Sequence, residues 1–151
     1  MNDSSTVAAS NDRSTPVLAT ILKGGGIGIV FAAVANVVIF LIGNAGAPLQ
    51  VETGGNPAVE DLNVFAVLIS STLFVIIGAV GAWVFERFLP NGFRIWSIVA
   101  VVLAAASVVP VNGFDVGNDS RLAVSAMHLM VAVAAIAGHV VARRSASTAA
   151  A

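Results

Sequence analysis

Cysteine is absent from the 151-residue chain, and charged side chains are scarce. Without cysteine the chain can form no disulfide, thiolate metal site, iron–sulfur cluster or covalent haem attachment through Cys-x-x-Cys-His. Only 10% of the residues are charged, against about 25% in a soluble domain, whereas 58% are hydrophobic. The mean hydropathy is +0.95. Because a protein in water must cover itself with solvated groups, this composition indicates that lipid surrounds most of the chain.

Positive charge is equally sparse, which bears on nucleic-acid binding. The formal net charge is −1, and no run of basic residues is interleaved with aromatic residues. Nucleic-acid-binding domains carry a basic patch or stripe that neutralises phosphates. The sequence therefore excludes nucleic acid as a partner.

Long apolar stretches are what the chain does have. Four contain no Asp, Glu, Lys or Arg: 24–43, 62–85, 95–114 and 122–142. A helix of about 20 residues crosses a hydrocarbon core roughly 30 Å thick. The alternation typical of barrel strands is missing. The sequence predicts an all-α fold, a four-helix transmembrane bundle with spans at about 24–43, 62–85, 95–110 and 122–142, the third being ended by Pro110.

The two ends of the chain differ from this apolar middle. Residues 1–16 are polar and rich in Ser, Asn and Thr, and residues 145–151 are small. Such composition cannot bury enough apolar surface to offset the entropy of ordering. We therefore expect disordered tails at 1–16 and 145–151 around one transmembrane domain at 17–144.

Basic residues predict the orientation of the bundle. If the N-terminus is cytoplasmic, six of the seven basic residues lie inside, and only Arg121 lies outside. Lys and Arg in short loops favour the cytoplasmic side. We expect a multi-pass protein of the cell (plasma) membrane with both termini in the cytoplasm.

Aromatic and loop residues suggest two surface features. Trp83 and Trp96 flank the inner loop, and aromatic rings prefer the depth of the lipid headgroups, so we expect an aromatic belt there. The outer loop at 44–61 is expected to be a solvated connector, with the apolar patch Ala47–Val51 against the membrane. A docking surface for an outside partner is the alternative for this loop.

Two histidines, His128 and His139, lie in the otherwise apolar fourth span. Four roles compete for His128: hydrogen bonding between helices, ligation of haem or (bacterio)chlorophyll, metal binding and proton transfer. Helix packing is favoured, because no carboxylate lies within the spans to complete a metal site or a proton relay. Its expected packing partners are polar residues of the other spans: Asn36, Ser70, Ser71, Thr72 or Ser107. His139, near Arg143, is expected to meet headgroups or water.

Small residues mark candidate helix contacts. Gly24 and Gly28 are spaced by four, as are Gly78 and Ala82, and such pairs let helix backbones approach closely in lipid. The residues expected in helix packing are Gly24, Gly28, Asn36, Gly78, Ala82 and Ser125.

The start of the fourth span carries a separate prediction. Asp119 and Ser120 are expected to cap this helix, because their side chains can accept hydrogen bonds from its first amides. Arg121 is expected to pair with Asp115 or Asp119 at the outer surface.

Several of these features together resemble a family of small, uncharacterised four-helix membrane proteins of prokaryotes, classed as a domain of unknown function. The matching features are Asn36 in the first span, Phe93–Arg94 in the inner loop, Val108–Pro110 at the end of the third span, and "LAVSAMHLM" at 122–130. The resemblance implies the fold and topology described above. It implies no activity and no catalytic residues.

We therefore expect a non-enzymatic integral membrane protein that acts as an accessory or scaffolding subunit of a larger membrane complex or as a homo-oligomer. Its expected partners are the lipid bilayer and other membrane subunits or itself, and no cofactor is expected. One alternative is a pigment- or haem-binding subunit that uses His128 to hold (bacterio)chlorophyll or haem. A second is a small transporter or channel.

Overall fold

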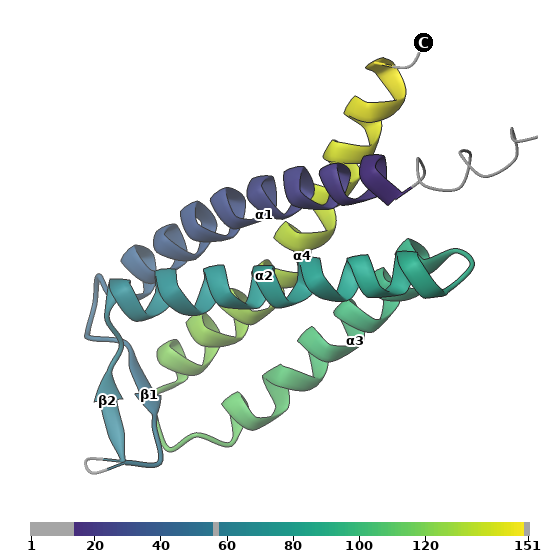
Figure 1. Cartoon of the computed structure of the whole chain (residues 1–151). Helices are drawn as coiled ribbons and strands as arrows, with labels where there is room; N and C mark the ends of the chain where they lie inside the picture. Colours follow the sequence, from purple (N-terminus) through teal and green to yellow (C-terminus); the bar gives the residue numbers. More distant parts are fainter. Residues whose placement is uncertain (1–13, 56–57, 150–151) are drawn as a thin grey trace, which may run out of the picture.

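Four long helices make up most of the described part of the chain (Figure 1). The computed structural model describes residues 14–55 and 58–149. The helices are α1 (Ser14–Gly43), α2 (Val64–Phe88), α3 (Gly92–Asn112) and α4 (Asn118–Ala149). All four are long and apolar enough to cross a membrane. The prediction of an all-α fold with four candidate spans is confirmed.

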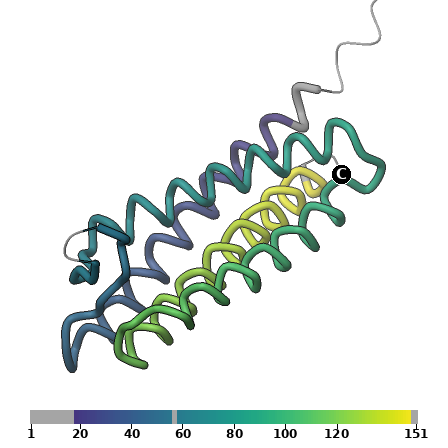
Figure 2. The backbone as a smooth tube through the Cα atoms, turned by 90° about the horizontal axis from the view of Figure 1, so that it is seen from below, coloured from purple at the N-terminus to yellow at the C-terminus, as the bar shows by residue number. Residues whose placement is uncertain are grey.

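The helices run alternately up and down along the bundle (Figure 2). α4 packs against α1 and α3, and α2 packs against the same two helices. The α2–α3 turn lies at the same end of the bundle as the start of α1 and the end of α4; we call this the turn end. The opposite end, the hairpin end, holds the α1–α2 and α3–α4 connections.

A short β-hairpin forms the α1–α2 connection, for which the sequence predicted a solvated connector without specifying strands. β1 (Gln50–Glu52) pairs antiparallel with β2 (Val59–Asp61). The hairpin is tied down by two hydrogen bonds: Leu49 N–H donates to Asn44 Oδ1 (3.0 Å), and Gln50 N–H donates to Ser120 Oγ (3.0 Å).

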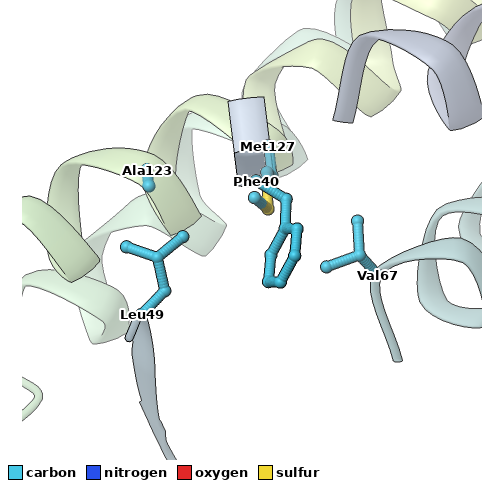
Figure 3. Packing of buried hydrophobic residues seen from close by; sticks show 5 residues of the cluster. All are labelled: Phe40, Leu49, Val67, Ala123 and Met127. Atoms are coloured by element: carbon cyan, nitrogen blue, oxygen red, sulfur yellow. The ribbon is translucent and has the colours of Figure 1, made fainter. Parts of the chain in front are cut away.

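The patch Ala47–Val51 does not lie as expected, because its Leu49 is buried in the protein. Leu49 is 1% exposed and packs in a cluster with Phe40, Val67, Ala123 and Met127 (Figure 3). Its side chain closes the hairpin end of the bundle. Burying a leucine there gains about 2 kcal/mol, so the loop folds onto the helices.

Both terminal helices extend beyond the predicted spans. α1 begins at Ser14, and the first-turn position of Pro16 is one that a helix tolerates. The prediction of disorder is wrong for 14–16 and for 145–149, and its remaining residues lie outside the described ranges. In α4 the hydroxyls of Ser145, Ser147 and Thr148 each donate to the carbonyl four residues earlier, so their polar groups are satisfied within the helix.

α3 continues two residues past Pro110, the expected end of the third span. It ends at Asn112, and the Gly113 N–H donates to the Pro110 carbonyl (2.9 Å). A proline so near the end of a helix removes one hydrogen bond without breaking the turns before it.

Candidate functional site

The inward side of α1 is a row of buried residues spaced by four. It comprises Gly24, Gly28, Ala32, Asn36 and Phe40, which we call the inward row. Residues four apart lie on one helix face, so the small residues Gly24, Gly28 and Ala32 form a continuous groove on it. α1 packs more extensively against α4 than against any other helix, and Figure 1 shows α4 running obliquely across it.

Glycines bring the two backbones into direct contact. A Cβ on Gly138 of α4 would overlap the Gly24 carbonyl oxygen and lie 2.7 Å from the Gly28 nitrogen. A Cβ on Gly24 would come within 2.9 Å of the His139 Cα, and one on Gly28 within 3.1 Å of the Ala134 oxygen. We call Gly24, Gly28 and Gly138 the glycine seam. At Gly24 and Gly138 a larger residue would push the two backbones apart, whereas at Gly28 it would require the neighbouring atoms to shift by a few tenths of an ångström.

Gly138 was missed by the sequence reasoning, although a signal for it existed. Ala134, Gly138 and Ala142 are spaced by four, and all three are buried. Read beside Gly24 and Gly28, this second small-residue row identifies the partner surface.

Asn36, the next residue of the inward row after Ala32, links three helices. Its Nδ2 donates to Ser71 Oγ of α2 (2.8 Å) and to the Met127 carbonyl of α4 (3.4 Å). Asn36 is 1% exposed, and its Oδ1 has no hydrogen-bond partner in the described part of the chain. Ser125 Oγ is likewise buried and unpartnered among the described residues.

The small residues of α2 face the indole of Trp96. A Cβ on Gly78 would lie 3.7 Å from Trp96 Cζ2, and Ala82 is 0% exposed in the same cluster. Trp96 is 3% exposed, so it is a core residue and the prediction that it belongs to an interfacial belt is wrong. Small residues on α2 leave room for an indole that would otherwise face lipid. Trp83 is 39% exposed.

His139 is buried beside this indole, contrary to the expectation that it meets headgroups or water. It is 1% exposed, with its ring centroid 5.1 Å from that of Trp96 and 6.3 Å from that of Phe93. The absence of a side chain on Gly24 allows α4 to lie close enough for the ring to be covered.

One nitrogen of His139 is unpaired. Its Nδ1 lies 2.8 Å from the Ala135 carbonyl oxygen, and because a carbonyl only accepts, Nδ1 carries the proton. Nε2 is buried and has no partner among residues 14–55 and 58–149. A buried unpaired polar atom costs about 1–3 kcal/mol. The packing around the imidazole ring must therefore offset this free-energy cost.

Charged residues complete this cluster at the turn end. The Arg143 guanidinium lies over the Phe93 ring, 4.3 Å from its centroid, and pairs with Glu86 of α2. A planar guanidinium can stack on an aromatic face and still hydrogen-bond through its edge. α2, α3 and α4 are thus joined by one group of side chains.

An open hollow of about 340 Å³ adjoins that group; we call it the turn-end hollow. It is lined by Glu86, Leu89, Asn91, Gly92, Phe93, Arg94 and Arg143. Asn91 adopts a left-handed conformation (φ 59°), and a Cβ on Gly92 would overlap the Phe85 carbonyl. The sharp α2–α3 turn that shapes the hollow therefore requires glycine at 92.

His128 lies apart from both groups. It is half-buried, and its Nδ1 lies 2.8 Å from the Val124 carbonyl oxygen of its own helix. In the described residues the expected hydrogen bond to another span is made by Asn36 instead. No three His, Cys, Asp or Glu residues gather into a metal site within 14–55 and 58–149. Ligation of a pigment or haem by His128 stays a prediction.

Arg121 forms no ion pair with Asp115 or Asp119 in the described structure, contrary to expectation. Both aspartates are exposed, and Arg121 Nε is buried without a partner among the described residues. α4 begins earlier than predicted, at Asn118, which places Asp119 in its first turn. Ser120, expected to cap the helix, instead accepts the hydrogen bond from the hairpin at Gln50.

Comparison with known proteins places the chain in a family. No curated protein and no solved structure matches it. The model of a family of unknown function, DUF6069, matches residues 16–147, which include all four spans, the glycine seam and the turn-end hollow. The chain therefore belongs to the family of unknown function DUF6069.

Proposed function

We propose that the protein is a non-catalytic, multi-pass subunit of a cell-membrane assembly, and that it pairs with a second copy through the outward side of α1. The observation that carries this proposal is a second row of residues on α1, spaced by four. It comprises Gly26, Val30, Val34, Val38 and Ile42, all exposed, and we call it the outward row. A shallow groove runs along it, lined by Gly26, Ile27, Val30, Phe31 and Val34.

Gly26 has no packing role within one copy. A Cβ added there would have no neighbour within 4 Å, whereas those added at Gly24 and Gly28 would meet α4. Small residues on a lipid-facing surface allow a second helix to approach closely, and van der Waals packing then drives association. The valines beside it have one strongly preferred helical rotamer, so ordering them at an interface costs little entropy.

Symmetry favours a second copy as the occupant of the groove. Two copies inserted in the same orientation are related by a twofold axis normal to the membrane, which sets the same residues at the same depth. An isologous interface of this kind brings the outward row against itself. All the residues that line the groove are apolar. Two copies paired through it would therefore bury apolar side chains against each other and no charge.

The orientation of the assembly is part of the proposal. With the turn end in the cytoplasm, six basic residues lie inside and Arg121 alone lies outside. Both termini are then cytoplasmic, and the hairpin faces outward.

The experiment uses the absence of native cysteine. Gly26→Cys and Val101→Cys each introduce a single thiol; Val101 is 55% exposed on α3 at a similar distance from the turn end, which makes it the matched control. A disulfide requires Cα atoms within about 7 Å. On oxidation in native membranes, Gly26→Cys should give a covalent dimer of the chain and Val101→Cys should not. Equal cross-linking of the two variants, or a monomer only, would overturn the proposal. A cross-link to a different protein would replace the second copy by that partner.

A pigment- or haem-binding role for His128 is the second candidate, because one observation favours it. Its Nδ1–H faces the Val124 carbonyl, which leaves the Nε2 lone pair as the ligating atom, the arrangement common in metal-bound histidines. The protein purified from native membranes should then absorb visible light, and the His128→Ala variant should not. A colourless preparation would remove this candidate.

A further inference from the structure

We propose that the turn-end hollow binds the phosphate headgroup of an anionic phospholipid. This site is separate from the outward row of α1, and the proposal does not depend on the dimer.

Charge and geometry suit a phosphodiester. The hollow is lined by two guanidinium groups, Arg94 and Arg143, and by one carboxylate, Glu86, which gives it a net charge of +1. Glu86 pairs with one terminal nitrogen of Arg143, so the carboxylate is already engaged. Arginine donates two parallel N–H groups that match phosphate oxygens. One phosphodiester, with one negative charge, balances the hollow.

The two arginines are held in different ways. Arg143 is fixed by its stacking on Phe93 and by Glu86, with its side chain still 42% exposed. Arg94 is exposed and stands in the first turn of α3, where Asn91 makes no side-chain hydrogen bond to cap the helix. The Arg143 guanidinium therefore has a fixed position in the hollow, while the exposed Arg94 side chain can move to contact a bound anion.

The surroundings of the hollow favour a lipid over a soluble anion. Leu89 lines the hollow and is 42% exposed, Phe88 beside it is 71% exposed, and Ile95 is 37% exposed. The hollow lies where α2 ends and α3 begins, at the ends of two candidate spans. With these helices in a bilayer, it lies at the depth of the phosphates, and the apolar surface beside it meets the acyl chains. Basic pockets in this position bind anionic headgroups.

The test measures lipid binding to the full chain. Detergent-solubilised protein is titrated with phosphatidylglycerol and, separately, with phosphatidylcholine, and bound lipid is counted by native mass spectrometry. Phosphatidylglycerol should bind at least about tenfold more tightly than phosphatidylcholine. Each of Arg94→Gln and Arg143→Gln should weaken phosphatidylglycerol binding by about tenfold, the loss of one charge-assisted contact.

The matched control is Arg144→Gln, which removes the same charge from an exposed residue that does not line the hollow. It should change the affinity less than twofold. Equal losses for Arg94→Gln and Arg144→Gln would show a general charge effect and overturn the proposal. Equal binding of the two lipids would also overturn it, as would displacement of phosphatidylglycerol by millimolar inorganic phosphate, which would assign the hollow to a free anion. Because Arg94 is exposed, Arg94→Gln remains decisive if the Arg143 variant is unstable.

Discussion

The inward and outward rows of α1 share the same spacing and differ in what lies opposite them. Both repeat every four residues, and both contain glycine near the turn end: Gly24 and Gly28 inward, Gly26 outward. Inward, the missing side chains bring α1 and α4 into backbone contact; outward, the missing side chain of Gly26 meets nothing. Glycine spacing on a membrane helix therefore marks a possible contact, and the partner helix decides whether the contact lies within one chain or between chains.

The first prediction concerns the contact between the inward row of α1 and α4, and it has the largest expected effect on the free energy of unfolding. In Gly138→Val a side chain must enter space held by backbone atoms of Gly24 and Gly28, which cannot move aside. We expect a loss of about 3 kcal/mol or more in the free energy of unfolding, or no folded protein. Thermal unfolding in mild detergent measures it, with Gly26→Val as the matched control. If both variants unfolded at the wild-type temperature, close backbone contact at the glycine seam would be contradicted.

The second prediction compares the two histidines of α4. In each of them Nδ1 donates to the backbone carbonyl four residues earlier. His139 faces Gly24 and is 1% exposed, whereas His128 is half-buried. His139→Ala should cost about 2 kcal/mol, because it leaves a cavity beside Trp96. His128→Ala should cost less than about 1 kcal/mol. Equal losses in unfolding midpoint would contradict the difference in packing.

The third prediction concerns the outward row and has the smallest expected effect on the free energy of unfolding. Gly26→Ala should stabilise a single copy by about 0.5 kcal/mol, because alanine fits a helix better than glycine and meets no neighbour here. The same change at Gly24 should destabilise it, because the added Cβ would lie 2.9 Å from the His139 Cα. Unfolding is measured in detergent at a dilution that yields monomers. Destabilisation at Gly26 would mean that α1 contacts another part of its own chain there.

Much of the fold could be predicted from the sequence, because lipid demands long apolar helices and these are visible as stretches without charge. The sequence did not show which face of each helix is buried in the bundle and which faces lipid. In water an apolar stripe marks the buried side, but a membrane helix is apolar all round. The spacing of Gly24 and Gly28 predicted a helix contact, but only the structure shows that α4 of the same chain makes this contact and that Gly26 faces away from the bundle.

Polar and aromatic residues misled the sequence reasoning for a related reason. His139 and Trp96 stand near the ends of their spans, where headgroups usually receive such side chains. Here Gly24 of α1 and the small residues Gly78 and Ala82 of α2 create room for both inside the bundle. Whether a polar ring faces headgroups or helices depends on residues distant in sequence. The Arg143–Glu86 pair likewise joins residues of two different helices.

The account rests on four helices crossing a bilayer with the turn end in the cytoplasm, and labelling of single cysteines tests this most directly. Glu52→Cys places a thiol on the hairpin and Pro90→Cys places one on the α2–α3 turn, and both positions are exposed. With a membrane-impermeant maleimide on intact cells, Glu52→Cys should be labelled, and Pro90→Cys should be labelled only after permeabilisation. Labelling of Pro90→Cys in intact cells, or of both variants alike, would contradict the account.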